Sequence, residues 1–128
     1  MKIRMKDNTI RLRLMQQEVE RFSTEGIVTT ATWMGASPEN CLTYTLKKND
    51  GSGSVTAFFE KGEVTVSVPA KLADDWAGTN KVGIEANMPL INGEHLYILI
   101  EKDFKCLQER PNEDESDAFP NPVEGNAC

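Results

Sequence analysis

The sequence has little of what usually marks a metal-binding, disulfide-bonded or membrane protein. It has one histidine and three cysteines, and no two cysteines form a CxxC pair. This pattern fits neither a zinc site nor a disulfide framework, so we expect reduced thiols and a cytoplasmic location. No apolar run approaches the roughly 18–20 residues of a membrane span. Charged residues also stand where a signal peptide would be apolar, so we expect no membrane partner.

Motifs of nucleotide-binding proteins and hydrolases are also missing. The chain has no P-loop, no GxGxxG fingerprint and no GxSxG nucleophile elbow. His95 is the single histidine, and the internal repeat described below places it at the position of Cys41. Two ligands without a third do not make a metal site. We therefore predict no catalytic residue, no cofactor and no bound metal.

Charge is distributed unevenly along a chain of ordinary globular composition, with 39% apolar and 27% charged residues in 128. Residues 1–54 have eight Lys/Arg and six Asp/Glu, residues 55–102 four and seven, and residues 103–128 two and seven. The amino-terminal part is therefore basic and the tail acidic. The net charge of −6 argues against a dedicated nucleic-acid binder.

Apolar residues alternate with polar ones on both sides of residues 6–9, which predicts a β-hairpin. Helical spacing follows over residues 15–24, and residues 49–54 (NDGSGS) read as a turn or linker. The other predicted elements are strands 27–34 and 41–48, a hairpin of 55–60 and 63–68, a helix over about 69–77, and strands 81–88 and 95–102.

The order strand–strand–helix–strand–strand thus occurs twice. Shifting residues 2–48 by 54 positions places them on 56–102 without a gap. Only four positions are identical, so the interpretation rests on the matched order of elements and on the matched apolar face. The apolar matches are Ile10/Val64, Leu12/Val66, Leu14/Val68, Val19/Ala73, Phe22/Trp76, Val28/Val82, Met34/Met88, Leu42/Leu96, Tyr44/Ile98 and Leu46/Ile100.

We predict an α+β fold in which the duplicated ββαββ units form an antiparallel β-barrel or curved sheets, with two short helices. A closed barrel would remove exposed strand edges. The repeats would be related by a pseudo-two-fold axis. Residues 1–104 would form a single domain, and residues 105–128, which contain three prolines and few apolar residues, an acidic C-terminal tail. We expect a monomer or a weak homodimer.

The second unit resembles the swapped-hairpin unit of the AbrB/MazE family, in which a strand ends near a proline and a short helix, a Gly-containing turn and a strand hairpin follow. These places are held by Val66-Ser67-Val68-Pro69, Leu72, Trp76, Gly78 and Val82. The resemblance implies interlocked units and DNA contact through basic residues near the first hairpin. The first unit departs from it, because Met15 stands in place of the proline.

Over most of its length the chain also resembles a family of small uncharacterised bacterial proteins. These open like MKIR…IRLRL…EVE and close like LYILIEKDF.CL…RP.EDESDAFPNP. The resemblance implies a common fold and carries no assigned activity.

The first hairpin carries a predicted anion-binding site. A turn at residues 6–9 sets Arg4 opposite Arg11 and Lys2 opposite Arg13 on one face. Like charges opposed in a sheet are destabilising, so we expect an anion to offset them, whether phosphate, nucleic acid or the chain's own tail. A solvated or internally paired face is the alternative. DNA is disfavoured, because the second unit has Thr56, Phe58, Thr65 and Ser67 at these four positions.

The tail holds a run of carboxylates beside an aromatic residue. Residues Glu113, Asp114, Glu115 and Asp117 lie within five positions, and the acidic spacing of a calcium loop is absent. A solvating tail is one interpretation. The other is docking, in which these carboxylates lie near Lys2, Arg4, Arg11 and Arg13. Phe119, which has two prolines nearby, would then fill an apolar groove.

These features favour a non-enzymatic accessory or interaction domain, whose basic hairpin and acidic tail mediate contacts with a partner that the sequence does not identify. The first alternative is a DNA-binding regulator of the AbrB type. The second is a barrel that binds or hydrolyses a small ligand.

Overall fold

The computed structural model describes residues 1–51, 53–104 and 119. Its elements follow the predicted order closely, because alternation and helical spacing are local properties of the chain. In chain order they are β1 (Lys2–Lys6), β2 (Thr9–Leu14), α1 (Gln16–Glu25), β3 (Ile27–Trp33), η1 (Pro38–Asn40), β4 (Cys41–Asn49), β5 (Thr56–Glu60), β6 (Glu63–Pro69), α2 (Ala70–Gly78), β7 (Gly83–Pro89) and β8 (His95–Lys102).

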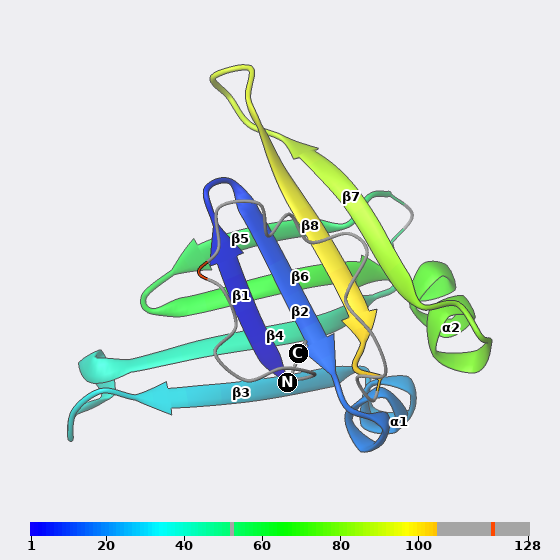
Figure 1. The fold of residues 1–128 in the computed structure, drawn as a ribbon, viewed down its shortest axis with the longest axis horizontal. Coiled ribbons are helices and arrows are strands. Elements are labelled where there is room, and N and C mark those ends of the chain that lie inside the picture. Colours follow the sequence, from blue (N-terminus) through cyan, green and yellow to red (C-terminus); the bar gives the residue numbers. More distant parts are fainter. Residues whose placement is uncertain (52, 105–118, 120–128) are drawn as a thin grey trace.

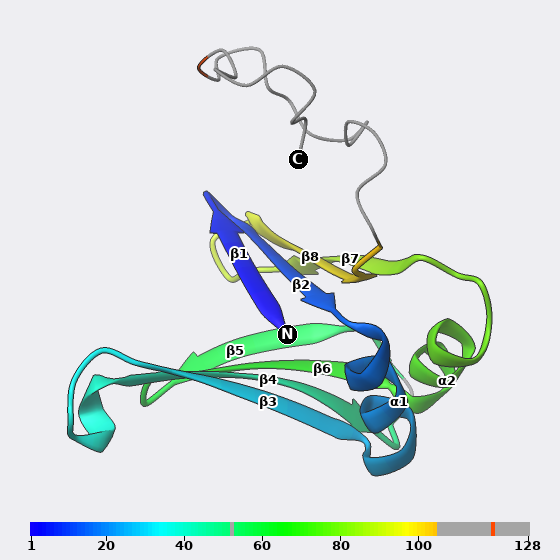
Figure 2. The same ribbon diagram turned by 60° about the horizontal axis from the view of Figure 1, so that its bottom comes forward.

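The strands form two separate four-stranded sheets, ordered β1-β2-β8-β7 and β3-β4-β6-β5. Figure 2 shows the sheets as two stacked layers, with α1 and α2 together at one end. The predicted α+β class with two α-helices is confirmed. A closed barrel is not formed among the described residues, since the two sheets share no strand. Each sheet instead stays open and buries one face against the other.

Both sheets are mixed, which corrects the prediction of purely antiparallel strands. The hairpins are antiparallel, but the central pairs, β2 with β8 and β4 with β6, are parallel. Each sheet takes one hairpin from the first unit and one from the second (Figure 1). Strand alternation did not reveal this, because it has the same period in parallel and antiparallel pairs.

The register of the strands repeats with the offset of 54. Arg13 of the first unit pairs with Glu101 of the second. The equivalent positions in the other sheet are Ser67, which is 54 positions after Arg13, and Lys47, which is 54 positions before Glu101, and these two also pair. Likewise Lys2 pairs with Arg13, and Thr56 with Ser67. Strand order and register are those of a duplicated ββαββ layout.

The duplication has one irregularity, which corrects the gapless match. β3 covers residues 27–33 and β7 residues 83–89, so their offset is 56. Gly26 ends α1 with φ 78° and leads directly into β3, a left-handed conformation that favours glycine. At the end of α2 stands Thr79 with φ −128°, and the chain needs residues 79–82 to reach β7.

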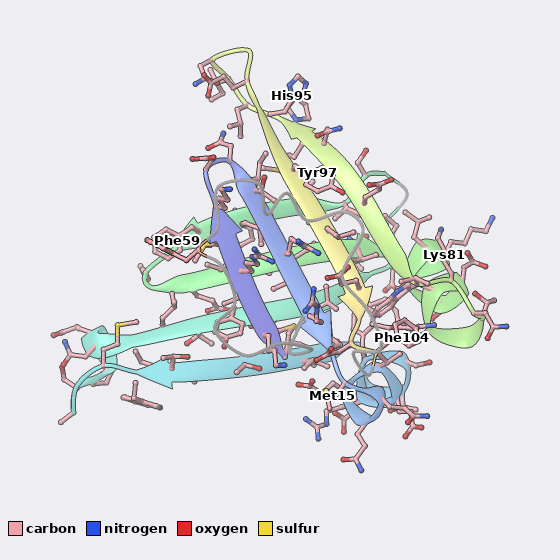
Figure 3. The ribbon with its side chains drawn as sticks, in the orientation of Figure 1. Met15, Phe59, Lys81, His95, Tyr97 and Phe104 are labelled. Atoms are coloured by element: carbon pink, nitrogen blue, oxygen red, sulfur yellow. The ribbon has the colours of Figure 1, made fainter. Side chains whose placement is uncertain are left out.

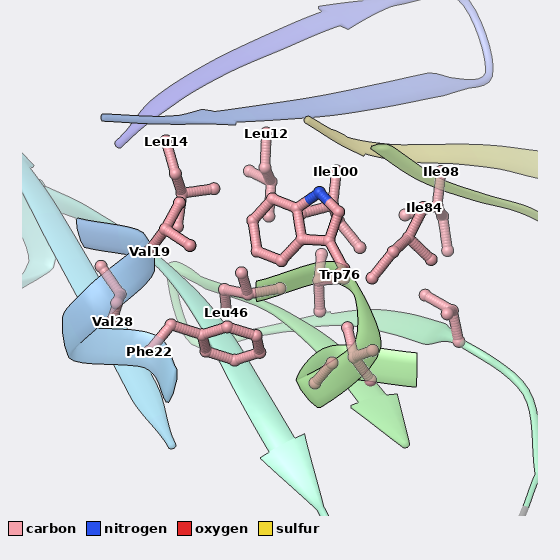
Figure 4. Packing of buried hydrophobic residues seen from close by; sticks show 14 of the residues in the cluster. Leu12, Leu14, Val19, Phe22, Val28, Leu46, Trp76, Ile84, Ile98 and Ile100 are labelled. Carbon is pink, nitrogen blue, oxygen red and sulfur yellow. The ribbon is translucent and has the colours of Figure 1, made fainter. Parts of the chain in front are cut away.

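The core lies between the inner faces of the sheets and is closed by the helices (Figure 4). Phe22 of α1 and Trp76 of α2 are fully buried and meet edge to face, with ring centroids 6.1 Å apart, a favourable aromatic geometry. The Trp76 indole N–H donates to the Val82 carbonyl oxygen over 2.9 Å. The predicted inner faces of both helices are therefore confirmed.

Candidate functional site: the arginine face

The outer face of β1 and β2 carries the basic residues that the sequence singles out. Alternate side chains of a strand point to opposite faces, and Leu12 between Arg11 and Arg13 is fully buried in the core. The pairing sets Lys2 opposite Arg13 and Arg4 opposite Arg11, so the predicted register of this hairpin is confirmed. We call Lys2, Arg4, Arg11 and Arg13 the arginine face.

A carboxylate on the neighbouring strand β8 pairs with two of these arginines. Glu101 Oε1 accepts hydrogen bonds from Arg13 Nε at 3.0 Å, Arg13 Nη2 at 2.7 Å and Arg11 Nη2 at 3.0 Å. The Glu101 side chain is 16% exposed, and both arginines are similarly covered. Charge-assisted hydrogen bonds are strong in such partly desolvated places. Glu101 therefore offsets much of the repulsion between the two guanidinium groups.

A second carboxylate lies where the chain leaves β8. Lys2 Nζ lies 3.2 Å from Asp103 Oδ2, and the Asp103 N–H donates to the Leu14 carbonyl oxygen over 2.8 Å. The end of β8 is thereby held beside β2 and β1. Asp103 thus lies at a corner of the arginine face.

The balance of these charges is positive. Lys2, Arg4, Arg11 and Arg13 contribute four positive charges, and Glu101 and Asp103 two negative ones, so these six side chains sum to +2. The sign is opposite to that of the whole chain, which is −6. A protein of acidic character therefore displays a local basic surface.

A groove of about 700 Å³ lies on the same sheet face and crosses β7, β8 and β2. Its lining residues are Thr9, Arg11, Val82, Gly83, Glu85, Tyr97, Leu99 and Glu101. The Tyr97 hydroxyl, on β8 in Figure 3, donates to Glu85 Oε2 over 2.6 Å. This bond to a carboxylate, aided by partial burial, raises the pKa of Tyr97 to about 12. At neutral pH the phenol therefore stays protonated and acts as a donor.

Gly83 leaves room for this groove at the edge of the sheet. A Cβ atom at this position would lie 3.1 Å from the Ile100 carbonyl oxygen and 3.4 Å from Leu99 Cδ1. A larger residue would press against the backbone of β8 and fill one end of the groove. The small volume of Gly83 therefore keeps this end of the groove open.

The other predicted site residues belong to the predicted tail. Glu113, Asp114, Glu115 and Asp117 lie outside the described residues, so their predicted contact with the arginine face stays a prediction. Phe119 is described, and its side chain is 97% exposed. The predicted burial of this ring in an apolar groove is therefore not observed. An aromatic ring next to prolines was too weak a signal to predict burial.

Cys41 and His95 do not come together as two ligands of one site. Cys41 begins β4 in one sheet and His95 begins β8 in the other. Within residues 1–51, 53–104 and 119, no group of three or more His, Cys, Asp or Glu side chains is placed to hold a metal ion. No helix in this described part is long and apolar enough to cross a membrane.

Sequence reasoning missed Glu101, Asp103 and the pair formed by Tyr97 and Glu85. These residues belong to the site because β8 lies beside β2, with a separation of 88 positions between Arg13 and Glu101. The available signal was the duplication itself: swapped hairpins would have placed the end of β8 next to the end of β2.

The comparisons with known proteins identify the family. The model of a family of unknown function, DUF7009, matches residues 1–123, and the chain belongs to this family. No curated protein and no solved structure matches the chain. The membership agrees with the resemblance to an uncharacterised family, whereas the comparisons establish neither a bacterial source nor a link to AbrB/MazE proteins.

Proposed function

We propose that this protein is a non-enzymatic interaction domain whose arginine face binds a carboxylate-rich segment of a protein partner. The observation that carries the proposal is the shared carboxylate, in which Glu101 Oε1 accepts bonds from both Arg11 and Arg13. The face already recognises one carboxylate with planar guanidinium groups, a geometry suited to carboxylates. Counted together with Glu101 and Asp103, the four basic residues carry a net positive charge that suits further acidic groups.

An acidic peptide fits this surface better than DNA does. The positions related to the arginine face by the repeat are Thr56, Phe58, Thr65 and Ser67, so the pseudo-two-fold arrangement supplies basic residues on one side only. DNA binding depends steeply on salt, and we expect only weak binding that is lost at physiological salt. Nanomolar binding of one DNA sequence at that salt would contradict this expectation.

The test uses the full chain with Glu113→Gln, Asp114→Asn, Glu115→Gln and Asp117→Asn, so that the protein supplies no acidic run of its own. Fluorescently labelled octaglutamate is the probe, and octaglutamine is its uncharged control. We expect octaglutamate alone to bind. Arg4→Gln should weaken this binding roughly fivefold to tenfold, because one charge-assisted contact contributes about 1–1.5 kcal/mol. Arg21→Gln, at an exposed arginine of α1, is the matched control and should have no effect.

Absence of octaglutamate binding at low salt would refute the proposed function. Equal losses in the Arg4 and Arg21 variants would also refute it, because binding would then follow the overall charge of the protein and not the arginine face.

The groove beside Arg11 supports a second candidate, the binding of a small polar ligand. Its volume of about 700 Å³ lies in the range of small-molecule sites, and Tyr97, Glu85 and Arg11 offer a hydroxyl, a carboxylate and a guanidinium group. A ligand there would change the near-ultraviolet absorbance of Tyr97. A panel of amino acids that leaves the absorbance of Tyr97 unchanged in the wild-type protein would count against this candidate.

A further inference from the structure

We infer that the resident occupant of the arginine face is the chain's own acidic segment, residues 113–117. This inference rests on the proposed function and names the first ligand of that site. Three observations support it: the place where the chain leaves the fold, the length of chain beyond that place, and the complementarity of charge.

The chain leaves the fold at the arginine face. Asp103 follows β8 directly, and its carboxylate lies 3.2 Å from Lys2 Nζ. Its N–H donates to the carbonyl oxygen of Leu14, the last residue of β2. Asp103, two residues before the tail, therefore lies beside the strands that carry the four basic residues and is already paired to one of them.

The tail is long enough to return over the whole face. Glu113 follows Asp103 by ten positions, and an extended chain over ten positions spans up to about 33 Å. Neighbouring strands lie only about 5 Å apart, so β1 and β2 are within easy reach. A segment linked this closely has an effective concentration of the order of millimolar at its site.

The charges are complementary in sign, and the arginine face differs in this from the other outer sheet face. The run of Glu113, Asp114, Glu115 and Asp117 carries four negative charges. The four basic residues of the arginine face, counted together with Glu101 and Asp103, carry a net charge of +2. In the other sheet the equivalent positions are Thr56, Phe58, Thr65 and Ser67, which carry no charge. An acidic segment is therefore attracted to β1 and β2, and the other sheet offers it no equivalent site.

The contact would be electrostatic and easily displaced. Phe119 is 97% exposed, so burial of this ring adds nothing to it. Exposed ion pairs are individually weak and are screened by salt. The segment then acts as a built-in competitor: a partner's acidic segment must displace it, and its apparent affinity is reduced accordingly.

The experiment compares the wild-type chain with the chain in which Glu113, Asp114, Glu115 and Asp117 are amidated as above. Octaglutamate is titrated into each at about 0.02 M and about 0.5 M sodium chloride. We expect the amidated chain to bind the probe about tenfold more tightly at low salt, given the millimolar effective concentration of the segment. The difference should disappear at high salt.

The matched control is Glu109→Gln with Glu124→Gln, which removes two tail charges outside the run and should change the affinity much less. Equal affinity of the wild-type and amidated chains would overturn the inference and leave the proposed function standing. Absence of binding by both chains would instead refute the proposed function. The higher affinity of the amidated chain could appear only at protein concentrations where sedimentation shows dimers. That result would overturn the inference that the segment binds within its own chain, because the segment would then come from a second copy.

Discussion

Glu101 shows how one residue makes a row of like charges compatible with a sheet. Arg4 pairs with Arg11 across β1 and β2, an arrangement that is unfavourable by itself. Glu101 lies on the next strand and bonds to Arg11 and Arg13 at 2.7–3.0 Å. The equivalent position in the first unit is Lys47, next to uncharged residues of β6. The counter-ion is therefore present only in the sheet that needs it.

Replacing Glu101 tests this role. Glu101→Gln leaves two half-buried guanidinium groups without their carboxylate, and we expect a loss of about 2 kcal/mol in the free energy of unfolding. Urea denaturation at neutral pH measures it. Glu94→Gln removes the same charge from the exposed turn between β7 and β8 and should cost under about 0.5 kcal/mol. Similar losses in both variants would show that Glu101 matters only through the net charge.

Tyr97 offers a test based on pH. Its pKa of about 12 results from the hydrogen bond to Glu85 and from burial, so in a Tyr44→Phe background the absorbance at about 295 nm should titrate near pH 12, above the ordinary value of about 10. Glu85→Gln should lower the midpoint, whereas Glu94→Gln should not. Because the folded state holds this proton more tightly, the bond's contribution to stability is complete below about pH 10. It is lost as the pH rises through about 12. A midpoint near 10 in the parent protein would exclude the bond.

At the scale of elements, the two helices show how the duplication builds the closed end of the core. Phe22 and Trp76 are related by the repeat and contact each other. Lys48 Nζ lies 6.0 Å from the Phe22 ring centroid and Lys102 Nζ 5.8 Å from that of Trp76, and these lysines are also 54 positions apart. Each unit thus has a lysine at or next to the end of its last strand, with its charge over the aromatic ring of the unit's own helix.

The connection between α2 and β7 decides which residue of the second unit enters the core. The gapless match predicts that Val82 takes the place of Val28, but the offset of 56 assigns it to Ile84. Val28 and Ile84 are 2% and 4% exposed, whereas Val82 is 53% exposed. The two extra residues therefore move β7 along by one full alternation, which keeps the inner face apolar.

Two substitutions distinguish these assignments. Ile84→Ala should lower the free energy of unfolding by about 2–4 kcal/mol, because it leaves a cavity in the core. Val82→Ala should cost under about 0.5 kcal/mol, since it keeps the backbone oxygen that binds Trp76. Thermal and urea denaturation measure both. A larger loss of unfolding free energy for Val82→Ala than for Ile84→Ala would support the gapless match.

At the scale of the whole molecule, the exchange of hairpins makes each sheet depend on both halves of the chain. β2 has β8 as its parallel neighbour, and β4 has β6. The inner faces of the two sheets form one core, with Leu12, Leu46, Val66 and Ile100 all fully buried. Neither half holds a complete sheet, so we expect the two units to fold as one domain.

Division of the chain in the linker tests this dependence. Separate fragments of residues 1–52 and 53–128 should lack a cooperative unfolding transition. Each fragment would hold only half of each sheet and is too short to bury the exposed core residues by itself. An equimolar mixture should recover the circular dichroism and the transition of the intact protein. A fragment that folds cooperatively as a monomer would show that the halves are independent domains.

Part of the candidate site was predictable and part was not. The pairing of Lys2 with Arg13 and of Arg4 with Arg11 follows from alternation and from the position of the turn at Asp7, all within a short stretch of chain. The contacts made by Glu101 and Asp103 depend on which strand lies beside β2. Many strands have suitable patterns for that place, and the alternation of apolar residues by itself does not rank them.

The sequence by itself determined the hairpins, the two helices, their apolar faces and the repeated order, because each depends on residues a few positions apart. The tertiary structure alone decided that hairpins of different units pair in parallel, that the sheets stay open, and that Glu101 meets Arg13 across 88 positions. These outcomes depend on how the apolar faces of all elements are buried together. Such burial is a property of the complete chain, to which every local pattern contributes and which none of them specifies.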